Sequence, residues 1–368
     1  MENKKNTSIA VLLSGGVDSS VALSILNEKN YNIEAFYLKI WLEDELSYLG
    51  NCPWKEDIYY AKSICDQLKI KLNIISMQKA YWENVVEYTI NQIKHGNTPN
   101  PDMLCNKFVK MGIFFDQIGK NYDFIATGHY AKNIYIDNKI YLGCVEDKIK
   151  DQTYFLSYTN KEKIYKTLFP LGEFNNKYSV RQYAETKKLL TAKRDDSQGI
   201  CFLGKIEFKK FVEYYCGKKV GNIIEIETGK KIAEHNGFWF YTIGQRKGIG
   251  LSGGPWFVID KNPYENIIFV SKICPKNKNE PDVFTIKNIN WLIEESEIPK
   301  NNYEIKLKLR HGPHFNKGEI ININNYNNDY KIKLFEKDQG IANGQFAAIY
   351  TNDEKICMGS GIMNKNNE

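Results

Sequence analysis

A polar stretch near the start of the chain, SGGVDSS at residues 14–20, has the residue types of a phosphate-binding loop. An apolar run precedes it and another follows it, which predicts a strand, a glycine turn and a helix. Gly15 and Gly16 let the backbone turn tightly, and the first N–H groups of the helix then face an anion. A serine-capped helix after a glycine turn is the alternative. Ser14 and Asp18 beside the glycines favour the ligand site.

The loop differs from a Walker A loop because no Lys-Ser or Lys-Thr pair follows its glycines. A loop without that lysine, directly after the first strand, resembles the pyrophosphate-binding loop of ATP pyrophosphatases. Members of that superfamily adenylate a carbonyl or carboxylate oxygen and release pyrophosphate. The resemblance implies that the chain binds ATP and splits it between the α- and β-phosphates.

Two cysteines lie in settings that favour a reactive thiolate. Cys105 follows a loop with two prolines, and we expect it in the first turn of a helix that begins near Asp102. The helix dipole and the charge of Lys107 would lower its thiol pKa. Cys201 lies in a polar, glycine-bearing loop close to two cations. The alternatives are a small buried hydrophobe for Cys105 and a loop cysteine at the edge of the core for Cys201.

The remaining cysteines indicate packing rather than chemistry. Eight cysteines in 368 residues are too few for a disulfide scaffold, and no C-x-x-C pair occurs, which disfavours a zinc or iron–sulfur site. We therefore expect a reducing, cytoplasmic location. The cysteines assigned to packing are Cys52, Cys65, Cys144, Cys216, Cys274 and Cys357.

Alternating strands and helices must position these residues. Apolar runs predict strands at 9–13, 33–38, 72–76 and 124–126, with helices at 54–68 and 81–94. This alternation is typical of an α/β fold with a doubly wound parallel sheet, which binds ligands beyond the carboxyl ends of its strands. The phosphate loop, Leu38 and the Gly128-His129 pair should converge there. For His129 the alternative is a hydrogen-bonded structural group.

The second half of the chain has a different pattern. After a helix at 208–215, glycine-punctuated short strands are expected, including strands within 237–260. Beyond a polar linker, strand-like runs recur without helices, which predicts a small β-barrel or sandwich. We predict an α/β catalytic domain, a small β-rich domain and a C-terminal β-barrel domain, at residues 1–205, 206–278 and 279–368.

Composition sets the broad class. Charged residues make up 26% and hydrophobic ones 42%, as in ordinary globular proteins. No long apolar run occurs, so we expect no membrane-spanning segment. The polar N-terminus predicts no signal or transit peptide. The net charge of +6 suits a nucleic-acid partner without demonstrating one.

Several long motifs together resemble the tRNA-specific 2-thiouridylase family, whose members replace oxygen by sulfur at position 2 of the wobble uridine. They extend over nearly the whole chain, and are SGGVDSS, TPNPDMLCN, ATGHYA, KDQTYFLS, DSQGICFLG, TIGQRKGIG and Gly344-Gln345. Two departures occur. Phe108 stands where the family commonly has an acidic residue, a change that affects only a contact beside the site. Asp195-Asp196 stands where the family usually has a single aspartate.

The resemblance implies ATP and Mg²⁺ as cofactors and tRNA as the partner. Asp18 is implied as a catalytic residue and as a candidate ligand of Mg²⁺. For Arg310 and His311, a solvated strand end is the alternative. The implied ATP-binding residues are Leu12, Leu13, Ser14, Gly15, Gly16, Val17, Asp18, Ser19, Leu38 and Gly128. The implied tRNA-binding residues are Asn100, Pro101 and Asp102 at the target base, with His129, Lys150, Asp151, Gln152, Arg310, His311 and Gln345 elsewhere.

The resemblance also implies a sulfur relay. Cys201 would carry a persulfide received from a cysteine desulfurase or a sulfur-relay protein. Cys105 would be the nucleophile that releases the sulfur, ending in a Cys105–Cys201 disulfide. Three other functions remain open on the sequence: an ATP pyrophosphatase of the amidotransferase type, a C-x-x-C tRNA thiolase, which the absent motif disfavours, and a non-catalytic RNA-binding module.

Overall fold

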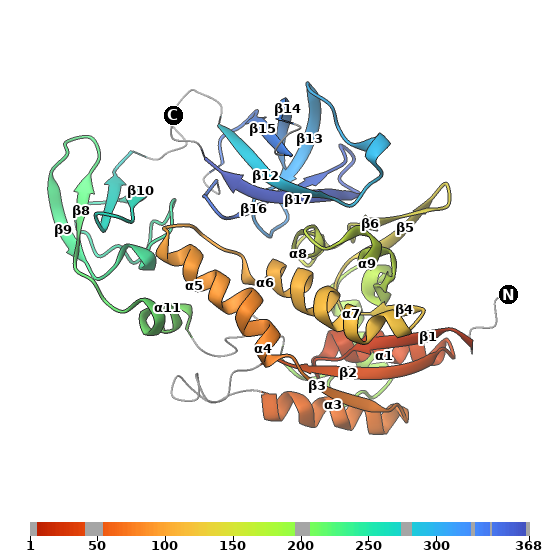
Figure 1. Cartoon of the computed structure of the whole chain (residues 1–368). Helices are drawn as coiled ribbons and strands as arrows, with labels where there is room; N and C mark the ends of the chain where they lie inside the picture. The colour runs from red at the N-terminus through yellow and green to blue at the C-terminus, as the bar shows by residue number, and fades with distance from the viewer. Residues whose placement is uncertain are drawn as a thin grey trace.

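Five parallel strands form the N-terminal sheet in the order β3-β2-β1-β4-β7 (Figure 1). The computed structural model describes residues 6–40, 54–195, 207–273, 282–324, 328–338 and 341–365. The order reverses beside β1: β2 and β3 extend to one side of it, and β4 and β7 to the other. The predicted parallel sheet is confirmed. Its strands are β1 Ser8–Leu12, β2 Asn32–Lys39, β3 Leu72–Ser76, β4 Phe124–Ala126 and β7 Thr167–Leu168.

Helices cover both faces of this sheet because successive side chains of a strand point to opposite faces. Ile9 and Val11 pack with the apolar side chains of α1, α3 and α10, whereas Ala10 and Leu12 pack with those of the helices after β3. The first group is α1 Val17–Glu28, α3 Trp54–Leu68 and α10 Lys177–Thr186. The second group is α4 Gln78–Tyr81, η3 Trp82–Val86, α5 Glu87–Lys94, α6 Pro101–Leu104, η4 Cys105–Ile113 and α7 Phe114–Gln117.

A smaller layer lies between the sheet and the C-terminal part of the chain. It contains an antiparallel hairpin and short helices, which lead from β4 towards β7. Its elements are β5 Lys132–Ile136, β6 Lys139–Gly143, α8 Thr153–Leu156 and α9 Lys161–Tyr165, while the 3₁₀ turns η5 Gly119–Asn121 and η6 Pro170–Glu173 come just before β4 and just after β7.

A four-stranded sheet in the order β10-β11-β8-β9 follows the predicted helix. Strands were expected within 237–260, but the chain there forms a 3₁₀ turn and an irregular loop before β10 begins. The loop contains four glycines with φ between 69° and 84°, a conformation that breaks a strand. The elements are α11 Phe208–Cys216, β8 Gly221–Glu225, β9 Lys231–His235, η7 Phe238–Phe240, β10 Phe257–Asn262 and β11 Ile267–Ser271.

The C-terminal strands close into a barrel in the order β12-β15-β14-β13-β16-β17, which confirms the predicted β-barrel. Alternate side chains such as Phe284 and Ile286 fill its core. One 3₁₀ turn, η9 Glu295–Glu297, interrupts the strands. The strands are β12 Val283–Trp291, β13 Tyr303–Lys308, β14 Asn316–Asn324, β15 Asp329–Leu334, β16 Phe346–Tyr350 and β17 Cys357–Asn364.

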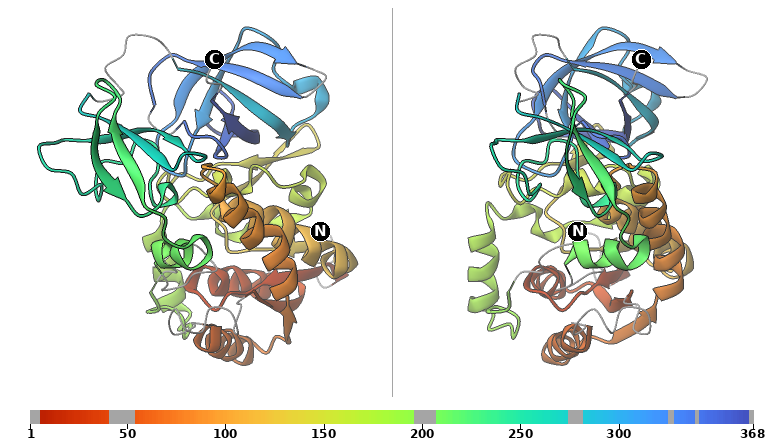
Figure 2. Two further views of the ribbon diagram at one scale, coloured as in Figure 1. Left: turned by 60° about the vertical axis from the view of Figure 1, so that its left-hand side comes forward. Right: turned by 90° about the vertical axis from the view of Figure 1, so that its left-hand side faces the viewer.

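The barrel rests on the α8 and β6 layer, while the four-stranded sheet lies beside α5 and α11 (Figures 1 and 2). The proposed borders between the domains fall in residues 196–206 and 274–281, outside the described residues. No helix in the described part of the chain is long and apolar enough to cross a membrane.

Candidate active site

The phosphate loop closes on itself through its serines. The Ser14 and Ser19 hydroxyls lie 3.1 Å apart, and Ser19 Oγ donates to the carbonyl of Gly16 at 3.2 Å. The N-cap of α1 is Gly16, and no side chain caps this helix. The alternative of a serine-capped helix is therefore wrong. The uncapped first turn, with the positive end of the helix dipole, can bind an anion.

The Arg194 side chain contacts the backbone of the phosphate loop. Its guanidinium donates to the Gly15 carbonyl at 2.7 Å and pairs with the Asp57 carboxylate. Gly15 has φ 80°, and a Cβ there would collide with the Asp57 carbonyl oxygen. Burial raises the pKa of Asp57, and the charge of Arg194 opposes that rise. Arg194 precedes Cys201 by seven residues in the sequence.

Asp18 is engaged by two residues that the sequence analysis missed. Asp18 Oδ1 accepts hydrogen bonds from Tyr130 Oη and Lys177 Nζ, each at 2.7 Å. The Asp18 side chain is 31% exposed and that of Lys177 is 14% exposed. Tyr130 belongs to the ATGHYA motif, so a signal for it existed. Lys177, the first residue of α10, lies in no motif.

The segment after β4 packs against the phosphate loop. A Cβ on Gly128 would lie 2.7 Å from the Ser19 nitrogen, which shows how closely the two backbones approach. His129 follows, with its Nδ1 2.9 Å from Thr127 Oγ1. Burial and the charge of Lys110 lower the pKa of His129 well below its usual value. His129 is therefore neutral at pH 7 and able to act as a hydrogen-bonding group.

The ends of three neighbouring strands meet here, as the sequence predicted. β1 pairs in parallel with β2 on one side and with β4 on the other, so the phosphate loop lies between Leu38 and Gly128. Leu38 is partly buried near the end of β2, opposite Ile75 of β3. The position where the strand order reverses is the usual ligand site of such sheets.

Cys105 lies deeper in its helix than predicted. Asn100 is the N-cap and accepts from the Met103 nitrogen at 3.3 Å, so Cys105 is the fifth residue and lies beyond the first turn. The first-turn prediction was wrong because the helix begins at Pro101. The Cys105 side chain is fully buried. Lys107 packs over the Tyr158 ring at 3.4 Å, and burial lowers its pKa to about 8.

Cys201 lies outside the described residues, and so does the expected Cys105–Cys201 disulfide. Cys52 and Cys274 are also outside them. Cys65 and Cys144 have side chains whose pKa burial raises to about 12, which suits packing rather than chemistry.

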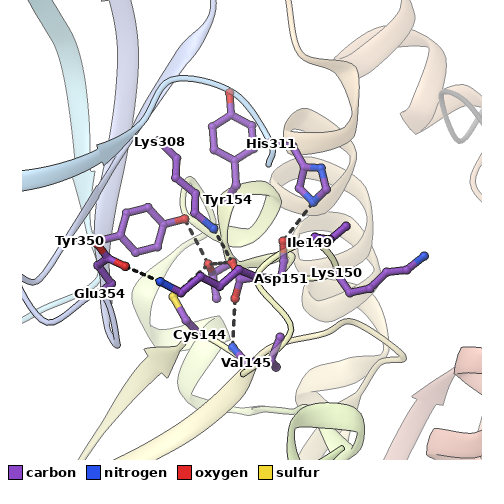
Figure 3. Close-up of polar contacts among 12 residues, drawn as sticks. Cys144, Val145, Ile149, Lys150, Asp151, Tyr154, Lys308, His311, Tyr350 and Glu354 are labelled. Carbon is purple, nitrogen blue, oxygen red and sulfur yellow. Dashed lines mark hydrogen bonds and ion pairs between the residues drawn. The ribbon is translucent and has the colours of Figure 1, made fainter. Parts of the chain in front are cut away.

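Two of the segments with predicted tRNA-binding residues are in contact, residues 150–152 of the catalytic domain and residues 310–311 of the barrel. Asp151 is 1% exposed and pairs with Lys308 of β13 at 3.0 Å (Figure 3). Gln152 lies beside it, and its Oε1 accepts from the Tyr130 nitrogen at 3.0 Å. His311 stacks on Phe155 with centroids 4.8 Å apart.

The barrel also contacts the loop before α6. The Thr98 nitrogen donates to the Asn343 carbonyl at 2.8 Å, and a Cβ on Gly344 would lie 2.9 Å from Asn97 Cβ. Gln345 follows, and its Oε1 is buried with no hydrogen-bond partner in the part of the chain that the structure describes. The loop that carries Asn100 is thus fixed by the barrel as well as by its own helix.

Known protein families match three consecutive parts of the chain. Family models match residues 7–205 (tRNA methyl transferase HUP domain), 209–272 (tRNA methyl transferase PRC-barrel domain) and 281–363 (Aminomethyltransferase beta-barrel domain). The tRNA-specific 2-thiouridylase MnmA of Parabacteroides distasonis is 46% identical over 357 residues, covering 96% of this chain and 98% of the relative. The chain belongs to the tRNA-specific 2-thiouridylase family. A second 2-thiouridylase, from Porphyromonas gingivalis, is 44% identical and covers 97% of this chain and 99% of its own.

One solved structure that matches part of the chain has a much lower sequence identity than these 2-thiouridylases. The NMN synthetase of Francisella tularensis is 16% identical, covers 57% of this chain and 77% of its own, and has a TM-score of 0.34. Membership in the 2-thiouridylase family therefore rests on the full-length relatives and the family models.

Proposed function

We propose that the protein replaces the 2-oxygen of the wobble uridine of tRNA by sulfur, using ATP to activate the carbonyl. The observation that carries this proposal is the uncapped first turn of α1 at the point where the strand order reverses, with the Gly128-His129 segment packed against it. Both lie in motifs by which the sequence resembles the 2-thiouridylase family. A uridine carbonyl has no good leaving group, and adenylation provides one.

Activation takes place at the phosphate loop. The N–H groups of the loop and of the first turn of α1 hold the phosphates, and Leu38 and Gly128 flank the adenosine. The uracil 2-oxygen attacks the α-phosphorus, so an O–P bond forms and the bond to the β-phosphate oxygen breaks. Lys177 supplies the positive charge that a Walker A lysine supplies in other nucleotide-binding loops.

Mg²⁺ is the cation that we propose for the released pyrophosphate. The described residues hold no cluster of three metal-binding side chains, so a cage made by the protein alone does not fit. A site with one carboxylate and several phosphate oxygens does fit, and it is the usual arrangement for Mg²⁺ at a nucleotide. Asp18 would provide that carboxylate, and the metal would neutralise charge on the leaving group.

Recognition of tRNA is shared by the catalytic domain and the barrel. Asn100, Pro101 and Asp102 would contact the target base, which must leave its stack to reach them. Gln345 would accept a hydrogen bond from the RNA, because a buried oxygen without a partner is costly unless a ligand supplies a donor. Lys150 and Arg310 would contact phosphates, so affinity should fall as salt rises.

Sulfur delivery uses two cysteines in sequence. A cysteine desulfurase or a relay protein leaves a persulfide on Cys201, whose terminal sulfur attacks C2 and displaces AMP. Cys105 then attacks the Cys201 sulfur and breaks the S–S bond. The products are 2-thiouridine and a Cys105–Cys201 disulfide, which a cellular dithiol reduces. This chemistry needs a reducing compartment, so we place the enzyme in the cytoplasm.

The test is incubation with unmodified tRNA, ATP, Mg²⁺ and a cysteine desulfurase with free cysteine as the sulfur source, followed by nucleoside analysis. We expect Asp18→Asn to lower 2-thiouridine formation and tRNA-dependent pyrophosphate release by on the order of 100-fold, as loss of one electrostatic group at a reacting phosphate does. Cys201→Ser should abolish thiolation while pyrophosphate is still released. Cys216→Ser is the matched control and should stay active.

Two outcomes would contradict the proposal. Thiolation that survives Asp18→Asn or Cys201→Ser would exclude these residues from the chemistry. Tight tRNA binding without any pyrophosphate release would favour the non-catalytic RNA-binding module. Mass spectrometry of sulfur-loaded protein decides the order of the cysteines, since a persulfide on Cys105 and never on Cys201 would reverse their roles.

A further inference from the structure

A buried ion pair joins the catalytic domain to the barrel. Asp151 lies in the turn before α8, and Lys308 is the last residue of β13. Their side chains are each 1% exposed, and Lys308 Nζ is 3.0 Å from Asp151 Oδ1. Lys308 takes no part in the chemistry proposed above. A fully buried ion pair between two domains is costly unless every polar atom has a partner.

Every polar group of Asp151 is used to fix the turn (Figure 3). Oδ1 also accepts from Thr153 Oγ1 at 2.6 Å, and Oδ2 accepts from the Val145 nitrogen at 3.0 Å. The Asp151 nitrogen donates to the Asp147 carbonyl at 2.9 Å. Its own carbonyl lies 3.0 Å from Nε2 of His311. A side chain so enclosed has no free edge for RNA, so Asp151 acts through its neighbours.

Those neighbours are the residues proposed to contact tRNA. Lys150 and Gln152 flank Asp151, and Arg310 and His311 follow Lys308 within three residues. Figure 3 shows Lys150 extending away from the ion pair, while His311 turns towards the Asp151 carbonyl. One ion pair therefore lies at the base of two segments that belong to different domains.

The same turn also reaches the phosphate loop. Gln152 holds the Tyr130 nitrogen at 3.0 Å, and Tyr130 Oη donates to Asp18 at 2.7 Å. Directional contacts therefore run from the barrel through the turn to the acidic residue of the loop. Charged pairs need one geometry, whereas apolar contacts between domains tolerate sliding.

We propose that Lys308 and Asp151 are a positioning pair that holds the barrel in one register with the catalytic domain, so that Lys150 and Arg310 meet the tRNA backbone as one rigid surface. Neither member of the pair touches RNA. This inference rests on the proposed function, because it concerns how the same tRNA is bound.

The test uses the full chain and compares Lys308→Met and Asp151→Asn with two matched controls. Lys231→Met and Asp116→Asn remove the same charges from ion pairs on the surface, where Lys231 and Asp116 have half or more of their side chains exposed. Measurements are the Kd for unmodified tRNA at two salt concentrations, KM and kcat for thiolation, the Kd for a non-hydrolysable ATP analogue without tRNA, and thermal melting.

We expect the Kd and KM for tRNA to rise roughly 10-fold or more in Lys308→Met, and the dependence of affinity on salt to weaken, because phosphate contacts act together only when they are in register. The kcat at saturating tRNA should change less than KM does. The controls should bind tRNA as the unaltered protein does. A lower melting temperature with unchanged tRNA affinity would overturn the inference, since it would make the pair merely structural.

A second variant covers the case in which one unpaired buried charge unfolds the protein. Lys308→Met combined with Asp151→Leu replaces the pair by apolar side chains, a change that is often neutral for stability. We expect this double variant to fold but to keep the reduced affinity for tRNA. Recovery of full affinity would overturn the inference. If the unaltered protein failed to bind tRNA, the proposed function and this inference would both be wrong, whereas equal binding by all variants would overturn the inference alone.

Discussion

Asp18 is the acidic side chain of the phosphate loop, and two residues already hold it. Lys177 Nζ and Tyr130 Oη each lie 2.7 Å from the same carboxylate oxygen. Lys177 comes from a helix 159 residues further along the chain. The loop thus has a lysine after all, supplied through the fold rather than through the motif. The ion pair keeps Asp18 in one orientation, in keeping with the activating role that we propose.

His129 makes stability depend on pH. Its folded pKa lies well below the usual value because of burial and Lys110, so between those two values the unfolded chain binds more protons than the folded one. The free energy of unfolding should therefore fall as pH drops below about 6.5, by up to about 1.4 kcal/mol per pH unit from this residue. Urea unfolding between pH 5 and 8 measures this. His129→Asn should flatten the profile.

Burial also lowers the pKa of His235 and His311, so these two histidines should make stability fall with decreasing pH in the same direction. The His129→Asn profile should accordingly keep a smaller slope. His95→Asn is the matched control, because His95 is exposed at the end of α5. A slope that His95→Asn reduces as much as His129→Asn does would contradict the assignment.

At the scale of elements, the start of α6 serves both the fold and the site. Asn100 caps the helix through the Met103 nitrogen, and Pro101 occupies the first helical position, where its missing N–H costs nothing. The helix then continues through a π-helical segment that begins at Cys105. Such segments are frequent at functional sites. The cap therefore sets where the helix begins and how far along it the thiol lies.

Replacing the cap tests its double role. Asn100→Ala should cost about 1 kcal/mol of stability, the usual effect of losing an N-cap. Asn160→Ala is a matched control, because Asn160 caps α9 in the same way, accepting from the Glu162 nitrogen at 2.9 Å. Thermal unfolding should show similar losses, whereas the thiolation assay should show reduced activity in Asn100→Ala alone. Equal activity in the two variants would leave Asn100 as a cap and nothing more.

At the scale of the whole molecule, the catalytic domain and the barrel share part of their buried core, and we expect them to unfold together. Barrel residues such as Phe346 and Tyr350 belong to the same buried cluster as Met103 and Tyr154 of the catalytic domain. Tyr154 Oη also donates to the Phe346 carbonyl at 3.1 Å. The four-stranded central sheet has a separate core of its own, which includes Ile268. Because of this shared burial, we expect the catalytic domain and the barrel to open as one unit and the central sheet to open separately.

Hydrogen exchange should show this division. Ile268→Ala and Phe346→Ala each remove a fully buried side chain, at about 2–5 and 3–5 kcal/mol respectively. We expect Ile268→Ala to speed exchange within residues 221–271, and Phe346→Ala to speed it in both the N-terminal sheet and the barrel. Faster exchange in β1 caused by Ile268→Ala would contradict the separate central unit.

The parts of the fold that the sequence predicted correctly depend on patterns among neighbouring residues. The strand, glycine turn and helix around residues 14–20 follow from neighbouring residues, as do the alternating strands of the sheet and the helix-free barrel. The helix start expected near Asp102 is confirmed at Pro101, but the exact first residue depends on the Asn100 cap and decides on which turn Cys105 lies. Of the strands expected within 237–260, only the start of β10 at Phe257 is found, because several glycines before it adopt positive φ.

The sequence by itself determined the kind of chemistry: a phosphate loop, two cysteines in helix and loop settings, and motifs of one family. Tertiary structure alone decided which side chains complete the site. Lys177 at Asp18, Arg194 at Gly15 and Lys308 at Asp151 join residues 159, 179 and 157 positions apart. Periodicity and turn chemistry act over a few residues, so they carry no information about pairs so distant. Only packing of the whole chain brings those charges together.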